Sequence, residues 1–214
     1  SWSVIDYYLN PKAGYYYVKR ACAPVLVSFQ PESDGVSVWL TNDTWKPVET
    51  RIRLTVRRVG DATPVRQIIL DGAAGANSSR PFGRFSAADL GVTSPATECL
   101  AAEHIGGEPF ETTVWFFEEL KSVTLPAARV SLEWSEVTSE LPGYHTYSAV
   151  LRSDQFAYFV GLEFPVDGVE CSSNYGVVLP GAPVTLRVTS PAPIASDEVT
   201  VRQLNPRLAE ATAG

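Results

Sequence analysis

The chain has 214 residues, of which 45% are apolar and 19% are charged, a composition that supplies a packed core and excludes a disordered charged tail. Its net charge of −7 argues against nucleic acids and anionic membranes as partners. No stretch of about 18 apolar residues without charges occurs, so we predict no transmembrane helix.

One short helix is predicted near the start of the chain. Asn10 can cap it, Pro11 suits its first position, residues 12–22 continue it, and Pro24 ends it. The segment 1–23 holds more tyrosines than a short helix needs for its own packing, so we expect this surface to face a larger partner. These tyrosines are Tyr7, Tyr8, Tyr15, Tyr16 and Tyr17.

After Pro24 the apolar residues change from helical spacing to alternation, which is typical of half-buried strands. Residues 73–95 are rich in Gly, Ser and Ala, and we predict mostly loop there. Asp71-Gly72 is predicted as the turn that closes the strand before this loop. The first set of about six predicted strands covers residues 25–29, 36–41, 51–57, 65–70, 97–105 and 112–117.

A second series of alternating segments follows a boundary near residues 121–128. Short strands separated by turns at about 8–12 residues are typical of an antiparallel sandwich. Two such series predict an all-β chain with two tandem antiparallel β-sandwiches, followed by a frayed tail at 206–214. The strands of the second series are predicted at residues 130–135, 147–151, 156–164, 184–189 and 199–201.

The cysteines and histidines predict no metal centre. Cys22, Cys99 and Cys171 lie far apart in the sequence, and only His104 and His145 could join them in a zinc site. We expect three free thiols and, because residues 1–21 also lack the pattern of a secretory signal, a cytoplasmic location. No cofactor is predicted.

A calcium site of Asp167, Glu170 and Asn174 is a weaker alternative to simple turn residues at these positions, and Asp154 is also predicted to be a turn residue.

No catalytic residue is assigned to the chain. No nucleophile-elbow or phosphate-loop motif occurs. Glu118 and Glu119 are neighbours on a predicted strand end, so their side chains point to opposite faces and cannot act as an acid and nucleophile pair. His104 and His145 have no sequence neighbours that would form a triad, and we predict structural or surface roles for them.

Aromatic side chains could form a platform for a sugar ring, but we favour core or inter-domain packing for them and assign no carbohydrate-binding residue. Two triplets, at Asn42 and Asn77, match the N-glycosylation acceptor and are expected to be chance matches. The tryptophans considered are Trp39, Trp45, Trp115 and Trp134, and the strongest of the weak candidates for sugar stacking are Trp134, Tyr144 and Tyr147.

Three patches of the sequence carry more specific motifs. Residues 1–28 contain SWSVIDYY, then YYYVKRA, then APVLVS; residues 38–43 read as a strand ending in Asn-Asp; and residues 172–181 contain SSNY followed by LPG. These patches resemble the β-mannosidases of glycoside hydrolase family 2, in which such a start leads into the last helix of the catalytic barrel and an Ala-Pro pair begins an immunoglobulin-like domain. Ser173 stands where the family usually has Asp.

The resemblance implies a domain plan. Residues 1–23 would be the end of a barrel whose body lies outside this sequence, 24–124 and 125–205 would be immunoglobulin-like β-sandwiches, and 206–214 a tail. The family hydrolyses terminal β-mannosides with retention through two glutamates of its barrel, and neither can be placed on this chain. The absence of Met also indicates a piece of a longer protein.

The resemblance thus implies non-catalytic accessory domains whose partner is the missing barrel. The parent could also be a related glycosidase with the same layout that acts on glucosaminides or on endo-linkages. A different functional class stays open, an independent β-sandwich module that binds carbohydrate or protein. The tyrosine-rich start favours the accessory role, because a free-standing module has no use for it. Without a barrel, the helix Pro11–Cys22 is expected to fray or to pair with a second copy of the chain in a homodimer.

Overall fold

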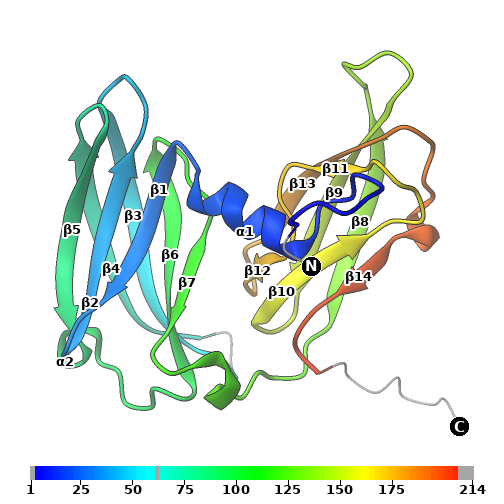
Figure 1. The fold of residues 1–214 in the computed structure, drawn as a ribbon. Helices are drawn as coiled ribbons and strands as arrows, with labels where there is room; N and C mark the ends of the chain where they lie inside the picture. The colour runs from blue at the N-terminus through cyan, green and yellow to red at the C-terminus, as the bar shows by residue number, and fades with distance from the viewer. Residues whose placement is uncertain (1–2, 61–62, 207–214) are drawn as a thin grey trace, which may run out of the picture. The chain divides into compact units, whose positions relative to one another are not determined.

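The computed structural model describes residues 3–60 and 63–206, so the predicted tail 206–214 lies outside these residues apart from Pro206. The predicted all-β class with one short helix near the start is confirmed (Figure 1). The chain forms two compact units, one of Lys19–Thr124 and one that joins Ser1–Val18 to Leu125–Gly214. No described helix is long and apolar enough to cross a membrane.

The first unit is a sandwich of two antiparallel sheets, one with the strand order β1-β2-β5 and one with the order β4-β3-β6-β7. A four-residue helix, α2 (Ala87–Leu90), follows β5, and a 3₁₀ turn (Leu120–Ser122) follows β7. The strands are β1 (Val25–Pro31), β2 (Gly35–Asn42), β3 (Val48–Arg58), β4 (Pro64–Ala74), β5 (Ser78–Ser86), β6 (Glu98–Gly107) and β7 (Thr113–Phe116).

Alternation along the first part of β3, residues 48–54, shows why this sequence forms a two-faced sheet. Ile52 and Leu54 are fully buried in the core between the two sheets, whereas Arg51 is exposed on the opposite face. Successive strand residues point to opposite faces, so the arginines are kept out of the core without interrupting the ladder. Arg51 lies opposite Asp71 and Ile52 lies opposite Leu70 on β4.

The prediction of a loop at 73–95 is wrong for most of that range, and so is the turn predicted at Asp71-Gly72. The strand β4 runs on to Ala74, and β5 then pairs with β2 over its whole length. Phe82 and Phe85 of β5 pack against the core, which stabilises a strand whose small and polar residues give little local signal. Pro81 is tolerated because β5 is an edge strand.

The second unit contains another sandwich, with the sheet orders β11-β13-β9-β8 and β12-β10-β14. The central strands β9 and β10 together supply six of the fifteen buried residues of its core cluster. Its elements are β8 (Val130–Val137), β9 (His145–Ser153), β10 (Ala157–Glu163), β11 (Glu170–Cys171), β12 (Gly176–Val178), β13 (Val184–Ser190), a 3₁₀ turn (Ser196–Glu198) and β14 (Thr200–Arg202).

The helix α1 (Ala13–Ala21) belongs in its first part to the second sandwich, although it precedes the first one in the chain. Asn10 does not cap it as predicted. The side chain of Asn10 instead donates to Asp167 Oδ1 at 2.7 Å and accepts from the backbone N–H of Gly168 at 3.0 Å, in the turn before β11. Residues 3–18 are therefore part of the fold of the second unit.

Aromatic rings fasten this segment to the second sandwich. Tyr16 is 2% exposed and is counted among the core residues of that sandwich, and its ring centroid lies 5.9 Å from that of Tyr175. Tyr17 stacks on Phe159 at 6.0 Å, and Phe159 lies 5.1 Å from Tyr175. Both Phe159 and Tyr175 adopt a left-handed backbone with φ 55, a conformation that bulky residues rarely adopt. The packing of the helix against these rings is what offsets that strain.

A buried asparagine organises one end of the first sandwich. Asn42 is 0% exposed, and its amide donates to the carbonyl oxygens of Lys46 at 2.8 Å and Gly75 at 2.8 Å. Its side-chain oxygen accepts from the backbone N–H and the hydroxyl of Thr44. The loop 43–47 is thereby joined to the turn after β4. Because the amide is buried and fully hydrogen-bonded, Asn42 cannot serve as a glycosylation acceptor in the folded chain.

Candidate functional site

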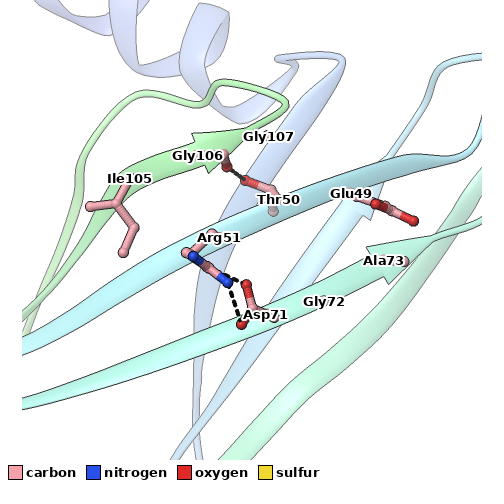
Figure 2. Close-up of a pocket in the computed structure, with 9 residues that line it drawn as sticks. All are labelled: Glu49, Thr50, Arg51, Asp71, Gly72, Ala73, Ile105, Gly106 and Gly107. Atoms are coloured by element: carbon pink, nitrogen blue, oxygen red, sulfur yellow. Dashed lines mark hydrogen bonds and ion pairs between the residues drawn. The ribbon is translucent and has the colours of Figure 1, made fainter.

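A hollow of about 470 Å³ lies on the outer face of the first sandwich, over β3, β4 and the end of β6 (Figure 2). It is open to solvent and combines charged side chains with bare backbone. Its size falls in the range of small-molecule sites. The lining residues are Glu49, Thr50, Arg51, Asp71, Gly72, Ala73, Ile105, Gly106 and Gly107.

An ion pair crosses the hollow between β3 and β4. Arg51 Nε donates to Asp71 Oδ1 at 2.5 Å and Arg51 Nη2 donates to Asp71 Oδ2 at 3.1 Å, so the pair is bidentate (Figure 2). The hydrogen bonds from Arg51 hold the pKa of Asp71 below its usual value, and those to Asp71 raise the pKa of Arg51. Both side chains stay more than half exposed, so each keeps atoms that a ligand can reach.

Two of the glycines that line the hollow are positions where a side chain would collide with neighbouring atoms of the sandwich. A Cβ on Gly72 would lie 1.9 Å from the Phe82 ring, and a Cβ on Gly107 would lie 2.3 Å from the carbonyl oxygen of Glu49. Gly107 also has φ +73, which favours glycine. Thr50 is buried and its hydroxyl donates to the carbonyl oxygens of Gly106 and Glu108, so it supports the floor.

Trp45 lies at the same end of the sandwich as the hollow. It belongs to the loop 43–47, which the Asn42 amide ties to Gly75, just after the β4 residues that line the hollow. The backbone N–H of Asn77 also donates to the carbonyl oxygen of Thr44. The Trp45 side chain is 86% exposed, the second most exposed large apolar residue of the described chain.

The sequence indicated only part of this site. Alternation along β3 predicted that Arg51 would face outward, but Asp71 was predicted as a turn residue. The partnership of Arg51 with Asp71 depends on the β3–β4 register, and the sequence pattern does not determine that register.

Two of the three candidates for sugar stacking in the second sandwich, Trp134 and Tyr147, are packing residues. Trp134 stacks on Tyr147 with centroids 4.5 Å apart, and its Nε1 donates to the carbonyl oxygen of Ile194. Tyr147 is 3% exposed and its hydroxyl accepts from the backbone N–H of Ile194. The stacked contact between the two rings covers one face of each. Tyr144, by contrast, is exposed in the loop between β8 and β9.

The remaining tryptophans of the first sandwich differ from Trp45. The ring centroids of Trp115 and Phe117 lie 4.8 Å apart, and Trp115 packs against the core, which agrees with the packing role favoured for it. Trp39 is partly buried on β2 between Ser28 and Pro81, its register partners on the neighbouring strands. Among the described residues, no ring contact joins Trp39 or Trp115 to Trp45, so the three rings do not form a common platform.

The residues considered for calcium have structural partners. Asn174 is buried, and its side chain accepts from the backbone N–H of Leu162 at 2.8 Å and donates to the carbonyl oxygen of Leu162 at 2.9 Å. Asp167 binds Asn10, and Glu170 is exposed on β11. Within residues 3–60 and 63–206, no cluster of three or more His, Cys, Asp or Glu side chains is placed to hold a metal ion.

The other titratable candidates are dispersed. Glu118 and Glu119 are both exposed, and Glu119 pairs with Lys121 at 2.5 Å. His104 Nε2 contacts the carbonyl oxygen of Gly107, whereas His145 Nδ1 lies 2.9 Å from Glu136 in an exposed hairpin of the other sandwich. Asp154 accepts from the backbone N–H of Arg129.

Cys22, Cys99 and Cys171 form no disulfide in the structure, and they are expected to differ sharply in reactivity. Burial raises the pKa of the Cys99 thiol to about 12, whereas Cys22 is exposed at the end of α1. Since the thiolate is the reactive form, Ellman's reagent should label Cys22 in the native protein at neutral pH and leave Cys99 and Cys171 unlabelled. The denatured, unreduced protein should release three thiols. Release of fewer would reveal a disulfide and contradict the structure.

The N-terminal segment has an exposed apolar side in addition to its docked side. Tyr7 is 92% exposed and Leu9 is 74% exposed, and Tyr8 and Val18 are also mainly exposed. Asp6 shapes this turn by accepting from the backbone N–H groups of Asn10 and Tyr8, bonds that lower the pKa of the Asp6 carboxyl. A cluster of exposed large apolar side chains on an ordered turn is typical of an interaction surface.

Two family models match the chain one after the other. The mannosidase Ig/CBM-like domain matches residues 34–122, and the Ig-fold domain matches residues 125–207. These ranges correspond to the two sandwiches, and they confirm that both are immunoglobulin-like.

Known relatives are much longer than this chain. β-Mannosidase B of Aspergillus niger is 23% identical over 88% of this chain and 24% of its own length. The β-D-mannosidase of Dictyoglomus thermophilum superposes with a TM-score of 0.81 at 24% identity, over 97% of this chain and 25% of its own. The exo-chitosanase CsxA of Amycolatopsis orientalis superposes with a TM-score of 0.72 at 18% identity, over 96% of this chain and 28% of its own. The chain therefore spans about a quarter of the length of these proteins.

Proposed function

Since the chain belongs to the immunoglobulin-like domains of the glycoside hydrolase family 2 β-mannosidases, we propose that it is a non-catalytic accessory part of a larger β-mannosidase-like hydrolase. In this role the two sandwiches brace the catalytic barrel of the parent enzyme. The parent would hydrolyse terminal β-mannosides with retention.

The observation that carries this proposal is that the N-terminal segment, residues 3–18, has both a docked side and an exposed apolar side. One side of it is docked on the second sandwich through Tyr16, while Tyr7 and Leu9 are exposed on an ordered turn. An exposed apolar surface of this kind is stable in water only when it is small or when another body covers it. The chain has about a quarter of the length of its relatives, and the barrel is the part of the parent that we assign to this surface.

The carboxylates of the chain favour an accessory role over catalysis. A retaining glycosidase needs two carboxyl groups about 5 Å apart, and its proton donor needs a raised pKa. Among the residues that the structure describes, hydrogen bonds lower the pKa of three carboxyls, those of Asp6, Asp71 and Asp89. A carboxyl with a lowered pKa stays ionised and accepts hydrogen bonds, whereas a general acid must keep its proton and therefore needs a raised pKa.

Activity measurements test the proposal directly. The 214-residue chain should release only background nitrophenol from an aryl β-mannoside, whereas the product of the longest reading frame that contains it should turn the substrate over. Turnover by the chain itself that disappears on replacing one Glu or Asp would contradict the accessory role. An inactive product of the longer frame would contradict the assignment to a hydrolase.

A surface variant tests the bracing role separately. Tyr7→Asp should lower the melting temperature of the longer product, because it places a charge in the covered surface, and should leave the melting of the 214-residue chain unchanged. Tyr144→Asp, in an exposed loop of the second sandwich, is the matched control and should have little effect in either context. Equal effects of Tyr7→Asp in both contexts would show that this surface has no partner.

An independent binding module for carbohydrate or protein is the alternative function, and the open hollow over β3, β4 and the end of β6 is the observation that favours it. A module of this kind would bind its ligand without a barrel. The same activity measurement separates the two functions, because a free-standing module predicts no glycosidase in any longer product.

A further inference from the structure

The strand β4 forms an open edge of the first sandwich. Among the described strands it pairs with β3 alone, so the backbone groups along its other side have no strand partner. With eleven residues it is the longest of the described edge strands. We propose that β4 pairs antiparallel with β4 of a second copy of this chain, so that the chain forms a dimer with two-fold symmetry. The proposal rests on the first sandwich only and does not depend on the accessory role.

The other long edges of the two sandwiches are protected. Open edge strands readily pair with other chains, and proteins block them with proline, bulges, charges or short length. The strand β5 carries Pro81 and a register irregularity against β2, and β8 exposes Glu133 and Glu136. The strand β7 covers part of β1, where the Thr113 hydroxyl donates to the carbonyl oxygen of Val27 at 2.9 Å. The remaining edge strands, β7, β11, β12 and β14, have at most four residues each.

Along most of its length β4 lacks these devices. Its proline, Pro64, is its first residue, and its register irregularity against β3 lies at the same end. Asp71 lies opposite the outward-facing Arg51, so alternate residues of β4 share that outer face. Two of them are apolar and well exposed, Val65 at 39% and Ile69 at 51%, which favours association with another strand. The five outward residues, all exposed, are Val65, Gln67, Ile69, Asp71 and Ala73.

This outward face is complementary to itself. When two β4 strands pair antiparallel in full register, Ile69 is the midpoint of the strand and lies on the two-fold axis. Side chains directly opposite each other share one face of the sheet and interact. Apolar residues therefore contact apolar residues across the axis, and no two like charges are opposed. The pairs across the axis are Ile69 with Ile69, Val65 with Ala73, and Gln67 with Asp71.

The contacts between Gln67 and Asp71 select this register. Arg51 holds the Asp71 carboxylate in place through its bidentate contact, and the Asp71 side chain is still 64% exposed, so its oxygens can accept from a further donor. The side-chain amide of Gln67 of the second copy is such a donor, and the symmetry forms the contact twice. A slip of two residues in either direction would place Asp71 opposite Val65 or Ile69 instead, and both contacts would be lost.

Sedimentation equilibrium of the 214-residue chain tests this proposal. The interface consists of main-chain hydrogen bonds along one strand and a few apolar side chains, so it is small, and we expect a Kd of about 100 μM. The average mass should rise from that of the monomer toward twice that value as the concentration is raised from about 1 μM to about 1 mM.

A charged variant at the axis should break the dimer. Ile69→Glu sets two carboxylates against each other across the two-fold axis and should weaken association at least about tenfold. The variant should stay folded, because Ile69 is exposed and lies opposite Arg53 on β3, which pairs favourably with a carboxylate. Val137→Glu is the matched control, since Val137 is an exposed apolar residue of the edge strand β8. It should associate like the unmodified chain.

Cysteine variants test the register in a Cys22→Ser background, which removes the exposed native thiol. Ile69→Cys should form an intermolecular disulfide on mild oxidation, because directly opposite residues have Cα atoms about 4.5–5.5 Å apart, within the range that a disulfide spans. Gln67→Cys should not do so, since its two copies would lie about 13 Å apart along the strands. Equal cross-linking of both variants would overturn the full-register pairing.

Three further results would overturn the dimer. The first is a chain that stays monomeric up to about 1 mM. The second is a dimer that survives Ile69→Glu and is lost in Tyr7→Asp, since its contact would lie on the N-terminal turn. The third is a monomeric 214-residue chain in which Ile69→Glu lowers the melting temperature of the longer product only, because the rest of the parent would then cover β4. The accessory role is judged separately, by turnover of the aryl β-mannoside.

Discussion

Replacing Tyr16 by alanine should destabilise the second sandwich by about 3–5 kcal/mol, the usual cost of truncating a fully buried aromatic residue. Tyr16 is 2% exposed and packs among core residues that lie more than a hundred positions later in the chain. Its loss would leave a cavity beside Tyr175 and remove the contact that offsets the left-handed backbone there. Chemical denaturation monitored by hydrogen exchange should show the loss in β9 and β13.

The control for this prediction lies on the same helix. Val18→Ala removes an exposed side chain and raises helix propensity, so it should change the stability of neither sandwich by more than about 0.5 kcal/mol. Exchange in β3 of the first sandwich should be the same in both variants. If Tyr16→Ala left β13 as well protected as before, the segment 3–18 would not belong to the second unit.

Replacing Asn42 by alanine should destabilise the first sandwich by about 2–4 kcal/mol. Its amide donates to carbonyl oxygens of Lys46 and Gly75, and these would be left without that partner in a buried site. Buried groups without partners cost about 1–3 kcal/mol each. The same change should loosen the loop 43–47, which the Asn42 amide holds through the carbonyl oxygen of Lys46.

Asn77→Ala is the matched control, because Asn77 is an exposed asparagine in the turn beside the same loop. Its left-handed backbone, with φ 47, makes alanine slightly unfavourable, and we expect a loss of about 1 kcal/mol at most. Denaturation monitored by the tryptophan fluorescence of the first sandwich measures both variants. Equal losses for Asn42→Ala and Asn77→Ala would show that the buried hydrogen bonds of Asn42 contribute no more than a surface turn.

The docking of residues 3–18 has a consequence for how the chain folds. The second unit is discontinuous, since the whole first sandwich is inserted between its helix and its strands. Closing such a long loop costs entropy before the contacts of Tyr16 form. We expect the first sandwich to fold as a continuous unit, and the helix to dock late, after β9, β10 and β13 have assembled.

The sequence alone determined the fold class and most strands, because alternation of apolar and polar residues is a local signal that survives in any sandwich. Val25, Val27, Ile52 and Leu54 are buried as their spacing predicted. The sequence motifs also pointed to the family that the domain matches then confirmed.

Three features could be known only from the tertiary structure, because each depends on contacts between residues that are distant in the sequence. The strand β5 forms because Phe82 and Phe85 find the core, although its local composition resembles a loop. Asn10 binds Asp167 instead of capping a helix, because the turn before β11 lies beside it. Asp71 becomes the partner of Arg51 through strand register, which turns two ordinary surface charges into a pre-organised pair. Local propensity is weak at all three places, so packing and pairing determine the outcome.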